Sequence, residues 1–432
     1  MLTHANVEEQ YEQASSDDIR ILIVGAGIAG VTAAALLRHD GRHPVVIDRA
    51  KDDEHAGYML ALMPLVDAAL DDLGVHERYR ESSVALERYG LHASNGRMLR
   101  NDSMVDILAR FGEYRGISRR ELIDVLTPEG CAVAFGSVVT ALDDSGTAST
   151  VTIESCGNAG GGSGARSGST RRQLEFDLVI VADGIHSSTR ALVLGDRAVA
   201  DSAVGIVDTK WGGWVVWAPE DTESDLGEEL WGARSFLGIY PVLGKVGVFL
   251  GGPNSDTQAG PAAFAEDMRR SVTTLSPRLE RALDAVARDP DPYYWPLTDC
   301  RSPAWAIGRT VLLGDAAAGF LPTAGIGAGM AIESAWVLTR MLRHATAGDV
   351  APDITAVLLA YERTQRPRVE AAQGNSRGLA RVMFRRSLVL AKLRDVAMRI
   401  VSVKLALGPI QKLLAEQPDP DAAAEALVAH SR

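Results

Sequence analysis

Cysteine is scarce in this chain, and long apolar runs are absent. The three cysteines, Cys131, Cys156 and Cys300, are scattered outside any CxxC pair, which argues against a disulfide framework and a structural zinc site. No stretch of about eighteen uncharged apolar residues occurs, as a membrane-spanning helix would need. The first eighteen residues lack the basic start and apolar core of a signal peptide. We therefore expect a cytoplasmic protein with reduced thiols, no metal site and a flexible acidic tail over residues 1–18.

Positive charge is also in short supply. The chain has 44 lysines and arginines against 56 acidic residues, a formal net charge of −12, so a nucleic-acid partner is not expected. With 46% hydrophobic residues over 432 positions, it can bury a large core divided among two or three domains. The apolar and basic stretch 387–410 departs from the acidic balance. It predicts helices that pack against the other domains, with contact to an anionic membrane surface as the alternative.

Residues 19–30, IRILIVGAGIAG, pass from a buried strand into a helix through three glycines. Gly25 permits a tight turn, Gly27 lets a pyrophosphate approach the backbone, and Gly30 lets the helix pack closely on the strand. The free N–H groups at the helix start attract phosphate. A second strand ends at Asp48, about twenty residues further on, where an acid can bind a ribose hydroxyl. This pattern predicts a dinucleotide site; the alternative is an ordinary βαβ unit whose glycines serve packing alone.

Two further apolar strands each end in an acid and a glycine. One is followed by Asp183 and Gly184, and the other by Gly314 and Asp315. Ligands of open parallel sheets bind at the carboxyl ends of the strands, so both pairs are expected at one crevice. A glycine-rich loop and a helix over residues 330–342 come next, and the start of that helix suits an anion or an electron-rich ring edge. Two such helix starts indicate one extended cofactor held at both ends.

Between residues 201 and 295 the pattern changes to alternating strands with many aromatic residues. Residues 235–242 and 245–252 predict a β-hairpin, and helical spacing returns over 264–287. This part predicts a separate, mostly antiparallel sheet, one face of which covers whatever the first domain binds. Trp214 and Tyr240 are candidate substrate contacts on that sheet, although aromatic residues in a sheet more often serve packing.

The three motifs together resemble those of the class A FAD-dependent monooxygenases, the para-hydroxybenzoate hydroxylase-like group, over roughly residues 19–375. The first glycines match the family's first fingerprint, the segment from Asp183 matches its DGxxSxxR motif, and the segment from Gly314 matches GDxxxxxxPxxGxG. The segment HAGYML, residues 55–60, is most similar to the tetracycline-inactivating and antibiotic-pathway members. The chain departs from the family's usual pattern at Ala318 and Ile326.

The resemblance implies an α/β fold: a Rossmann-like FAD-binding domain, a mostly antiparallel β-sheet substrate domain, and C-terminal helices. The expected FAD-binding domain is discontinuous: a short segment of the substrate domain lies between its first and second segments. The ranges are 19–80, 99–200 and 296–350 for the FAD-binding domain, 81–98 and 201–295 for the substrate domain, and 351–432 for the C-terminal helices.

The resemblance also implies where FAD is held. It places the ribityl chain near Asp315, the flavin ring at the helix start 325–329, and Arg119 near the flavin. Pro322 joins Trp214 and Tyr240 as an expected substrate contact. The expected cofactor-binding residues are Gly25, Gly27, Ile28, Ala29, Gly30, Asp48, Arg49, Arg119, Asp183, Gly184, Gly314, Asp315, Pro322, Gly325, Gly327, Ala328 and Gly329.

The implied reaction is the hydroxylation or epoxidation of a small aromatic or polycyclic substrate in secondary metabolism or antibiotic modification. NAD(P)H, bound transiently, reduces FAD, O2 adds at the flavin C4a carbon, and the hydroperoxide transfers oxygen to the substrate. No catalytic side chain is assigned, because the positioned cofactor performs the transfer. The alternatives are a flavin-dependent halogenase, a flavin-binding protein without turnover, and an NAD-dependent dehydrogenase.

Overall fold

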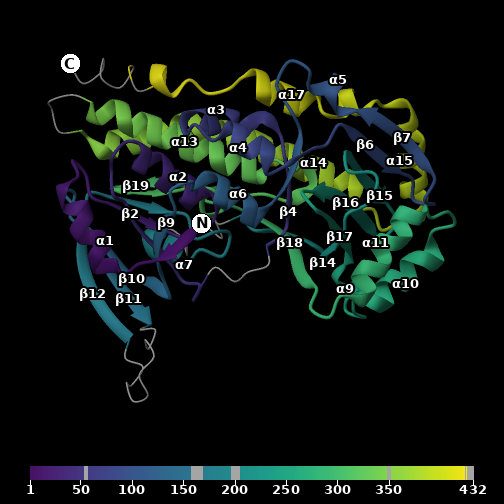
Figure 1. The fold of residues 1–432 in the computed structure, drawn as a ribbon, viewed down its shortest axis with the longest axis horizontal. Helices are drawn as coiled ribbons and strands as arrows, with labels where there is room; N and C mark the ends of the chain where they lie inside the picture. Colours follow the sequence, from purple (N-terminus) through teal and green to yellow (C-terminus); the bar gives the residue numbers. More distant parts are fainter. Residues whose placement is uncertain (53–56, 157–168, 196–204, 348–351, 424, 426–432) are drawn as a thin grey trace.

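The computed structural model describes residues 1–52, 57–156, 169–195, 205–347, 352–423 and 425. Two large sheets lie at opposite ends of the molecule and long helices run above them (Figure 1). This arrangement confirms the predicted α/β fold with a Rossmann-like part and a mostly antiparallel part.

The first sheet has seven strands in the order β1-β9-β3-β2-β13-β20-β19, all parallel except β19. Its central strands are apolar along their whole length because helices cover one face and a small antiparallel sheet, β10-β11-β12, covers the other (Figure 1). The strands are β1 Leu2–His4, β2 Ile21–Val24, β3 Val45–Asp48, β9 Cys131–Phe135, β10 Ser137–Asp144, β11 Ser149–Cys156, β12 Ser169–Phe176, β13 Leu178–Val181, β19 Ala306–Ile307 and β20 Thr310–Leu312.

The prediction of a flexible tail over residues 1–18 is wrong. β1 forms the edge of the first sheet beside β9, and α1 (Val7–Gln13) follows with Asn6 as its N-cap. The buried side chain of Gln10 accepts from the N–H of Val46 at 2.9 Å and donates to its carbonyl oxygen at 3.2 Å. The tail is ordered because it satisfies backbone groups of β3 that would otherwise lack partners.

The second sheet has seven strands in the order β18-β14-β17-β16-β15-β6-β7. Helices α10 and α11 pack on one face through an apolar cluster, and the other face looks toward the first sheet. The domain boundaries predicted at residues 98 and 295 both fall inside strands of this sheet. β7 continues to Ser103, and β18 continues to Arg301. The elements are β6 Arg88–His92, β7 Met98–Ser103, β14 Val207–Pro219, β15 Leu226–Trp231, β16 Phe236–Val242, β17 Lys245–Pro253, β18 Tyr293–Arg301, α10 Pro261–Ser271 and α11 Pro277–Arg288.

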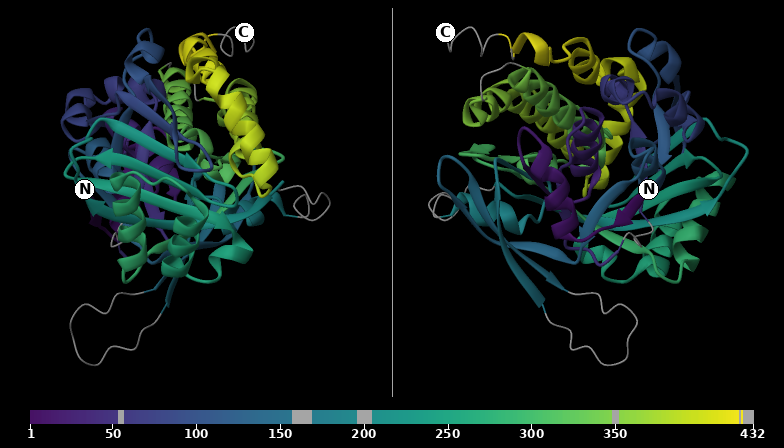
Figure 2. Two further views of the ribbon diagram at one scale, coloured as in Figure 1. Left: turned by 90° about the vertical axis from the view of Figure 1, so that its right-hand side faces the viewer. Right: turned by 60° about the vertical axis from the view of Figure 1, so that its left-hand side comes forward.

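Long helices join the two halves. α13 packs against α2 and α14, α15 lies beside β7 of the second sheet, and the chain then turns back so that α17 packs against α14 (Figures 1 and 2). None of the helices in the described part of the chain is long and apolar enough to cross a membrane. These helices are α2 Ile28–His39, α13 Gly327–Thr346, α14 Ile354–Met383, α15 Leu388–Ile400, α16 Val403–Ala406 and α17 Gly408–Ala415.

Shorter elements complete the connections, including a small sheet β4-β8-β5 between the two halves. Residues 53–56 lie outside the described residues, so the structure describes only Gly57–Leu60 of the HAGYML segment. The remaining strands and helices are β4 Met59–Leu62, β5 Val84–Ala85, β8 Arg115–Ser118, α3 Asp67–Asp72, α4 His76–Glu81, α5 Met104–Leu108, α6 Arg119–Leu126, α7 Ser188–Leu194, α9 Asn254–Thr257, α12 Asp315–Ala318, and the 3₁₀ turns η1 Ala14–Ser16, η2 Pro64–Val66 and η3 Pro322–Ala324.

Candidate cofactor and substrate site

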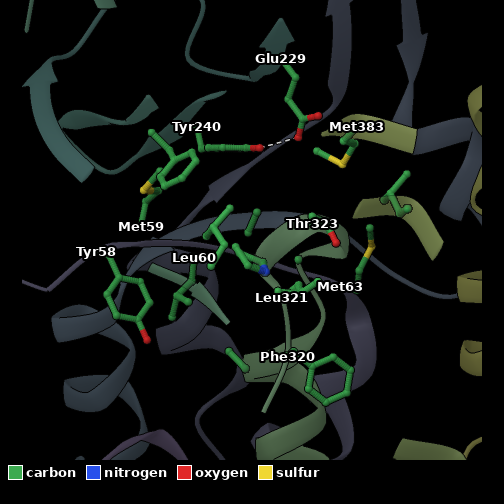
Figure 3. A pocket seen from close by; sticks show the side chains of 18 of the residues that line it. Tyr58, Met59, Leu60, Met63, Glu229, Tyr240, Phe320, Leu321, Thr323 and Met383 are labelled. Carbon is green, nitrogen blue, oxygen red and sulfur yellow. Dashed lines mark hydrogen bonds between the residues drawn. The ribbon is translucent and has the colours of Figure 1, made fainter. Parts of the chain in front are cut away.

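A cavity of about 450 Å³ lies between the two large sheets. Its walls come from the carboxyl ends of β2 and β13, the start of α13, the inner face of the second sheet and the C-terminal helices. Figure 3 shows Phe320 and Leu321 on one side of it and Glu229 on the other. Most of the lining side chains are apolar, so its few polar groups decide what the cavity can bind.

The three glycines where β2 passes into α2 serve different purposes. Gly25 has a φ of +108°, and a Cβ there would lie 2.4 Å from the carbonyl oxygen of Ala182. A Cβ on Gly30 would lie 1.9 Å from the carbonyl oxygen of Gly25, whereas one on Gly27 would meet nothing within 4 Å. Gly27 also lines the cavity. Gly25 and Gly30 are therefore required by the fold itself, and the space beside Gly27 is open to a ligand.

Two helix starts open onto this cavity. α2 begins after Gly27 and α13 begins after Ile326, and neither helix has a side chain that caps its first N–H groups. The loop before α13 turns through Gly325, whose φ is +62° and whose added Cβ would lie 3.2 Å from the carbonyl oxygen of Ala61. Uncapped helix starts offer free donors and partial positive charge. Together they suit a ligand with a phosphate at one end and an electron-rich ring edge at the other.

Asp315 supplies a carboxylate to the same cavity. It begins α12 directly after β20, and no described residue forms a hydrogen bond or ion pair with its side chain. Burial raises its pKa to about 6. A carboxylate that lines the cavity and has no donor among the described residues fits a ligand that brings hydroxyl groups, such as a sugar chain. Gly314, with a φ of +59°, makes the turn that brings Asp315 there; a Cβ on it would lie 2.7 Å from the Cβ of Ala29.

Asp183 and Arg190, from the second motif, hold the loops together. Asp183 Oδ2 accepts from the N–H of Thr189 at 3.2 Å, while Oδ1 is buried and has no partner among the described residues. The buried guanidinium of Arg190 donates to the carbonyl oxygens of Ile185 at 2.8 Å and Ala316 at 2.9 Å. Arg190 therefore connects the second motif to the third and fixes their spacing.

Asp48 and Arg49 lie outside the cavity lining. The carboxylate of Asp48 accepts from the N–H of Ala26 at 2.6 Å and from the N–H of Ala50 at 2.8 Å. It thereby braces the glycine turn from the side of β3. Arg49 is exposed beside it.

Arg119 reaches the cavity from the start of α6. Ser118 caps this helix: its hydroxyl accepts from the N–H of Glu121, and the Glu121 carboxylate accepts from the N–H of Ser118, both at 3.2 Å. This is the capping box expected from the sequence. The N–H of Arg119 donates to the carbonyl oxygen of Tyr58 at 2.9 Å. The cap fixes where α6 begins and so aims Arg119 at the cavity.

Two of the three expected substrate contacts lie at the cavity and one does not. Tyr240 and Pro322 line the cavity. The prediction for Trp214 is wrong, because its ring packs on the opposite face of the second sheet, at 5.8 Å from the ring of Phe264 in α10. Side chains of a strand alternate between faces, so Val215 takes the position at the cavity instead.

Glu229 is a functional candidate that the sequence analysis missed. Its buried carboxylate accepts from the Tyr89 hydroxyl at 2.6 Å, the Trp231 indole N–H at 2.6 Å and the Tyr240 hydroxyl. Burial raises its pKa above the ordinary value, and Figure 3 shows Tyr240 directed at it. The available signal was an acid in the middle of an apolar strand, LGEELW. Such an acid is buried only with partners.

The structure therefore gathers most, but not all, of the expected residues at one cavity. Those in its lining are Gly27, Ile28, Ala29, Arg119, Gly184, Asp315, Pro322, Gly325, Gly327, Ala328 and Tyr240. Those outside the lining are Gly25, Gly30, Asp48, Arg49, Asp183, Gly314, Gly329 and Trp214.

A family model described as an FAD binding domain matches residues 18–376. The chain belongs to this FAD-binding family. The 3-amino-4-hydroxybenzoate 2-monooxygenase of Streptomyces cremeus is 30% identical over 388 residues, which cover 84% of this chain and 87% of that protein. Klebsiella pneumoniae HpxO complexed with FAD and uric acid has a similar fold, with a TM-score of 0.74 at 22% identity over 94% of this chain and 98% of that one. Tetracycline destructase Tet(55) follows at a TM-score of 0.65 and 20% identity, covering 93% and 98%.

The resemblance to the class A monooxygenases is thus confirmed, and the protein is an FAD-dependent monooxygenase. Its cavity fits FAD on two observations: the open space at Gly27 and the unpartnered carboxylate of Asp315. The residues that would hold FAD are those of the two helix starts and the two acid–glycine strand ends. No cluster of three or more potential metal ligands occurs in the described parts of the chain.

Proposed function

We propose that this flavoprotein uses NAD(P)H and O2 to hydroxylate or epoxidise an aromatic or polycyclic substrate, in secondary metabolism or antibiotic modification. The observation that carries the proposal is the single cavity in which two uncapped helix starts and Asp315 lie on one side and the Glu229 cluster on the other. The first side suits the cofactor and the second suits the substrate.

When bound and reduced, FAD would supply the electrons that activate O2, one atom of which enters the product. The chain contributes the placement. The N–H groups at Gly27 would bind the pyrophosphate, Asp315 would accept from hydroxyl groups of the ribityl chain, and the N–H groups at Gly327 would donate to the edge of the flavin ring. None of these groups has a competing partner within the described chain.

The substrate side combines apolar walls with one polar cluster. Val215, Phe236, Phe249 and Leu297 present carbon surface from the second sheet, which favours a flat, largely apolar molecule and excludes water from the reacting atoms. Glu229 lies among these apolar side chains in the cavity lining and provides a hydrogen-bond acceptor. An aromatic ring with a hydroxyl or N–H group on its edge matches this arrangement.

Glu229 has one acceptor position left for such a group. Its Oε2 accepts from two donors and its Oε1 accepts only from Tyr240. In the proposed complex the substrate hydroxyl donates to Oε1, directly or through the Tyr240 hydroxyl. When the proton passes to Oε1, the oxygen left on the ring carries the negative charge and makes the ring more electron-rich. The ring is then a better acceptor of an electron-poor oxygen atom.

The test is oxygen transfer by the purified protein. We expect a yellow protein that oxidises NAD(P)H faster when a phenolic or polycyclic substrate from a panel is added, with one atom of ¹⁸O from ¹⁸O2 in the product by mass spectrometry. A colourless protein, or a yellow one that neither oxidises NAD(P)H nor yields a labelled product with any member of the panel, would contradict the proposal.

A further inference from the structure

Helix α15 lies on the protein with its polar side inward. The buried guanidinium of Arg394 donates to the carbonyl oxygens of Met383, at 3.1 Å, and Trp231, and pairs with Asp395 at 2.9 Å. The other carboxylate oxygen of Asp395 accepts from the N–H and the hydroxyl of Ser94, at 2.8 and 2.6 Å. These contacts fix the rotation of the helix about its axis.

The opposite side of α15 is apolar and faces outward. Val389, Leu393, Val396 and Ile400 follow one another at spacings of four, three and four residues, which places them on one stripe. Their exposed fractions are 66%, 62%, 57% and 82%. An ordinary surface helix turns such a stripe toward the core. Further exposed apolar side chains extend the stripe at both ends: Leu388, Leu390 and Leu405.

A contiguous exposed apolar surface of this kind marks an interaction site. The anchors at Arg394 and Asp395 prevent α15 from rotating to bury its stripe, so the stripe needs a partner outside the chain. α15 lies at one end of the molecule beside β7 (Figure 1).

The charges around the stripe indicate which partner. From Arg381 to Lys412 the sequence has eight arginines and lysines and one acidic residue, Asp395, in a chain whose net charge is −12. The carboxylate of Asp395 already pairs with Arg394 and accepts a hydrogen bond from Ser94. The exposed stripe is therefore flanked by positive charge alone from its own segment, including the exposed Lys392, Arg399 and Lys404.

We propose that α15 and α16 dock on the surface of an anionic phospholipid bilayer. The apolar stripe would enter the boundary between headgroups and acyl chains, and the basic side chains would meet the lipid phosphates. A second copy of the chain fits less well, because a two-fold interface places the same patch against itself and would bring the basic side chains of both copies together.

The inward side of the same segment reaches the cavity. Met398 of α15, Val403 of α16, and Leu407 and Ile410 beyond them are among its lining residues. The docked segment would therefore separate the cavity from the bilayer by a single layer of helices. This places the cavity where a lipophilic substrate dissolved in the membrane can reach it. That last step rests on the proposed function, whereas the docking does not.

Vesicle flotation of the full-length flavoprotein tests the docking directly. We expect it to float with vesicles of phosphatidylglycerol and phosphatidylcholine, and to float far less with phosphatidylcholine alone or in high salt. The double variant Leu393→Asp/Val396→Asp should lower the partition coefficient about tenfold or more. Lys392→Gln/Arg399→Gln should lower it by a similar factor, and only for the anionic vesicles. The matched control is Leu359→Asp, which changes an exposed leucine on α14 and should float like the wild type.

Circular dichroism and the flavin spectrum show whether each variant is folded, since all the altered side chains are exposed. Two results would overturn the proposal: wild-type protein that stays at the bottom of the gradient with anionic vesicles, or a folded Leu393→Asp/Val396→Asp variant that floats as well as the wild type. Light scattering can give a third result that would overturn the proposal. A wild-type dimer that the same double variant converts to a monomer, without vesicle binding, would show that a second copy covers the stripe. Turnover is not used in any of these measurements, so their failure is distinct from failure of the proposed reaction.

Discussion

Replacing Glu229 by glutamine would separate its chemistry from its packing. Glu229 Oε2 accepts from Tyr89 and Trp231, and Oε1 accepts from Tyr240. In Glu229→Gln the amide oxygen can keep the first two bonds, while the NH2 group takes the place of Oε1 and donates to the Tyr240 oxygen. The side chain keeps its shape and its neighbours, but it can no longer accept a proton.

The magnitudes follow from that exchange. All three hydrogen bonds to the carboxylate become neutral ones, and this loss is offset because a buried charge is removed, so the free energy of unfolding should change by no more than about 1 kcal/mol. Loss of a positioned proton acceptor should lower kcat/KM for a phenolic substrate about 100-fold, or about 3 kcal/mol of activation free energy. Burial raises the pKa of Glu229, so wild-type kcat/KM should rise with pH as Glu229 ionises, through a limb above the usual range for a glutamate. The variant should lack that limb.

Glu228 provides the matched control for this assay. It is adjacent in sequence but points to the other face of the sheet, where it pairs with His92 at 2.6 Å and accepts from Arg278 at 2.9 Å. Glu228→Gln should lower the free energy of unfolding by about 3 kcal/mol because it breaks a buried charge network, yet keep the pH limb. The reasoning is refuted if Glu229→Gln retains kcat/KM within about threefold of wild type and shows the same pH limb.

Two further predictions concern the cofactor end. Gly27→Ala should weaken FAD binding, measured by fluorescence titration, with little loss of thermal stability. Gly30→Ala should destabilise the fold itself, because its Cβ would lie 1.9 Å from the carbonyl oxygen of Gly25, whereas a Cβ on Gly27 meets nothing within 4 Å. Equal effects of the two variants on stability would contradict this. Burial raises the pKa of Asp315 to about 6 from 3.8, so the FAD-free protein should lose stability as the pH rises from about 4 to above 6. Asp315→Asn should remove that loss, stabilise the FAD-free protein at pH 8 and weaken FAD binding. Chemical denaturation across pH checks the sign, and a variant less stable than wild type at pH 8 would contradict it.

Local rules account for what the sequence predicted well. The turn at Gly25, the cap at Ser118 and the strand ends at Asp183 and Asp315 each depend on a few consecutive residues, whose geometry the chain itself imposes. The family motifs then connected them, and the structure brings Gly27, Arg119 and Asp315 to one cavity.

Contacts between distant segments account for what it missed. Alternation places Trp214 and Val215 on opposite faces of a strand, but only the packing of α10 decides which face is covered by helices. Glu229 becomes a cavity acceptor because β15 pairs with β6 and β16, which carry Tyr89 and Tyr240. The order of residues 1–18 depends similarly on Gln10 meeting β3. The acid within LGEELW signals that Glu229 needs partners, but no segment by itself identifies the distant residues that it meets.

The central claim is that one cavity holds FAD between the starts of α2 and α13 and presents its ring to a substrate beside Glu229. A crystal structure of the FAD complex tests it most directly. We predict electron density for the pyrophosphate at Gly27 and for the flavin ring between Gly327 and the Glu229 side of the cavity. A complex in which FAD lies outside this cavity, or in which its ring points away from Glu229, would contradict the account.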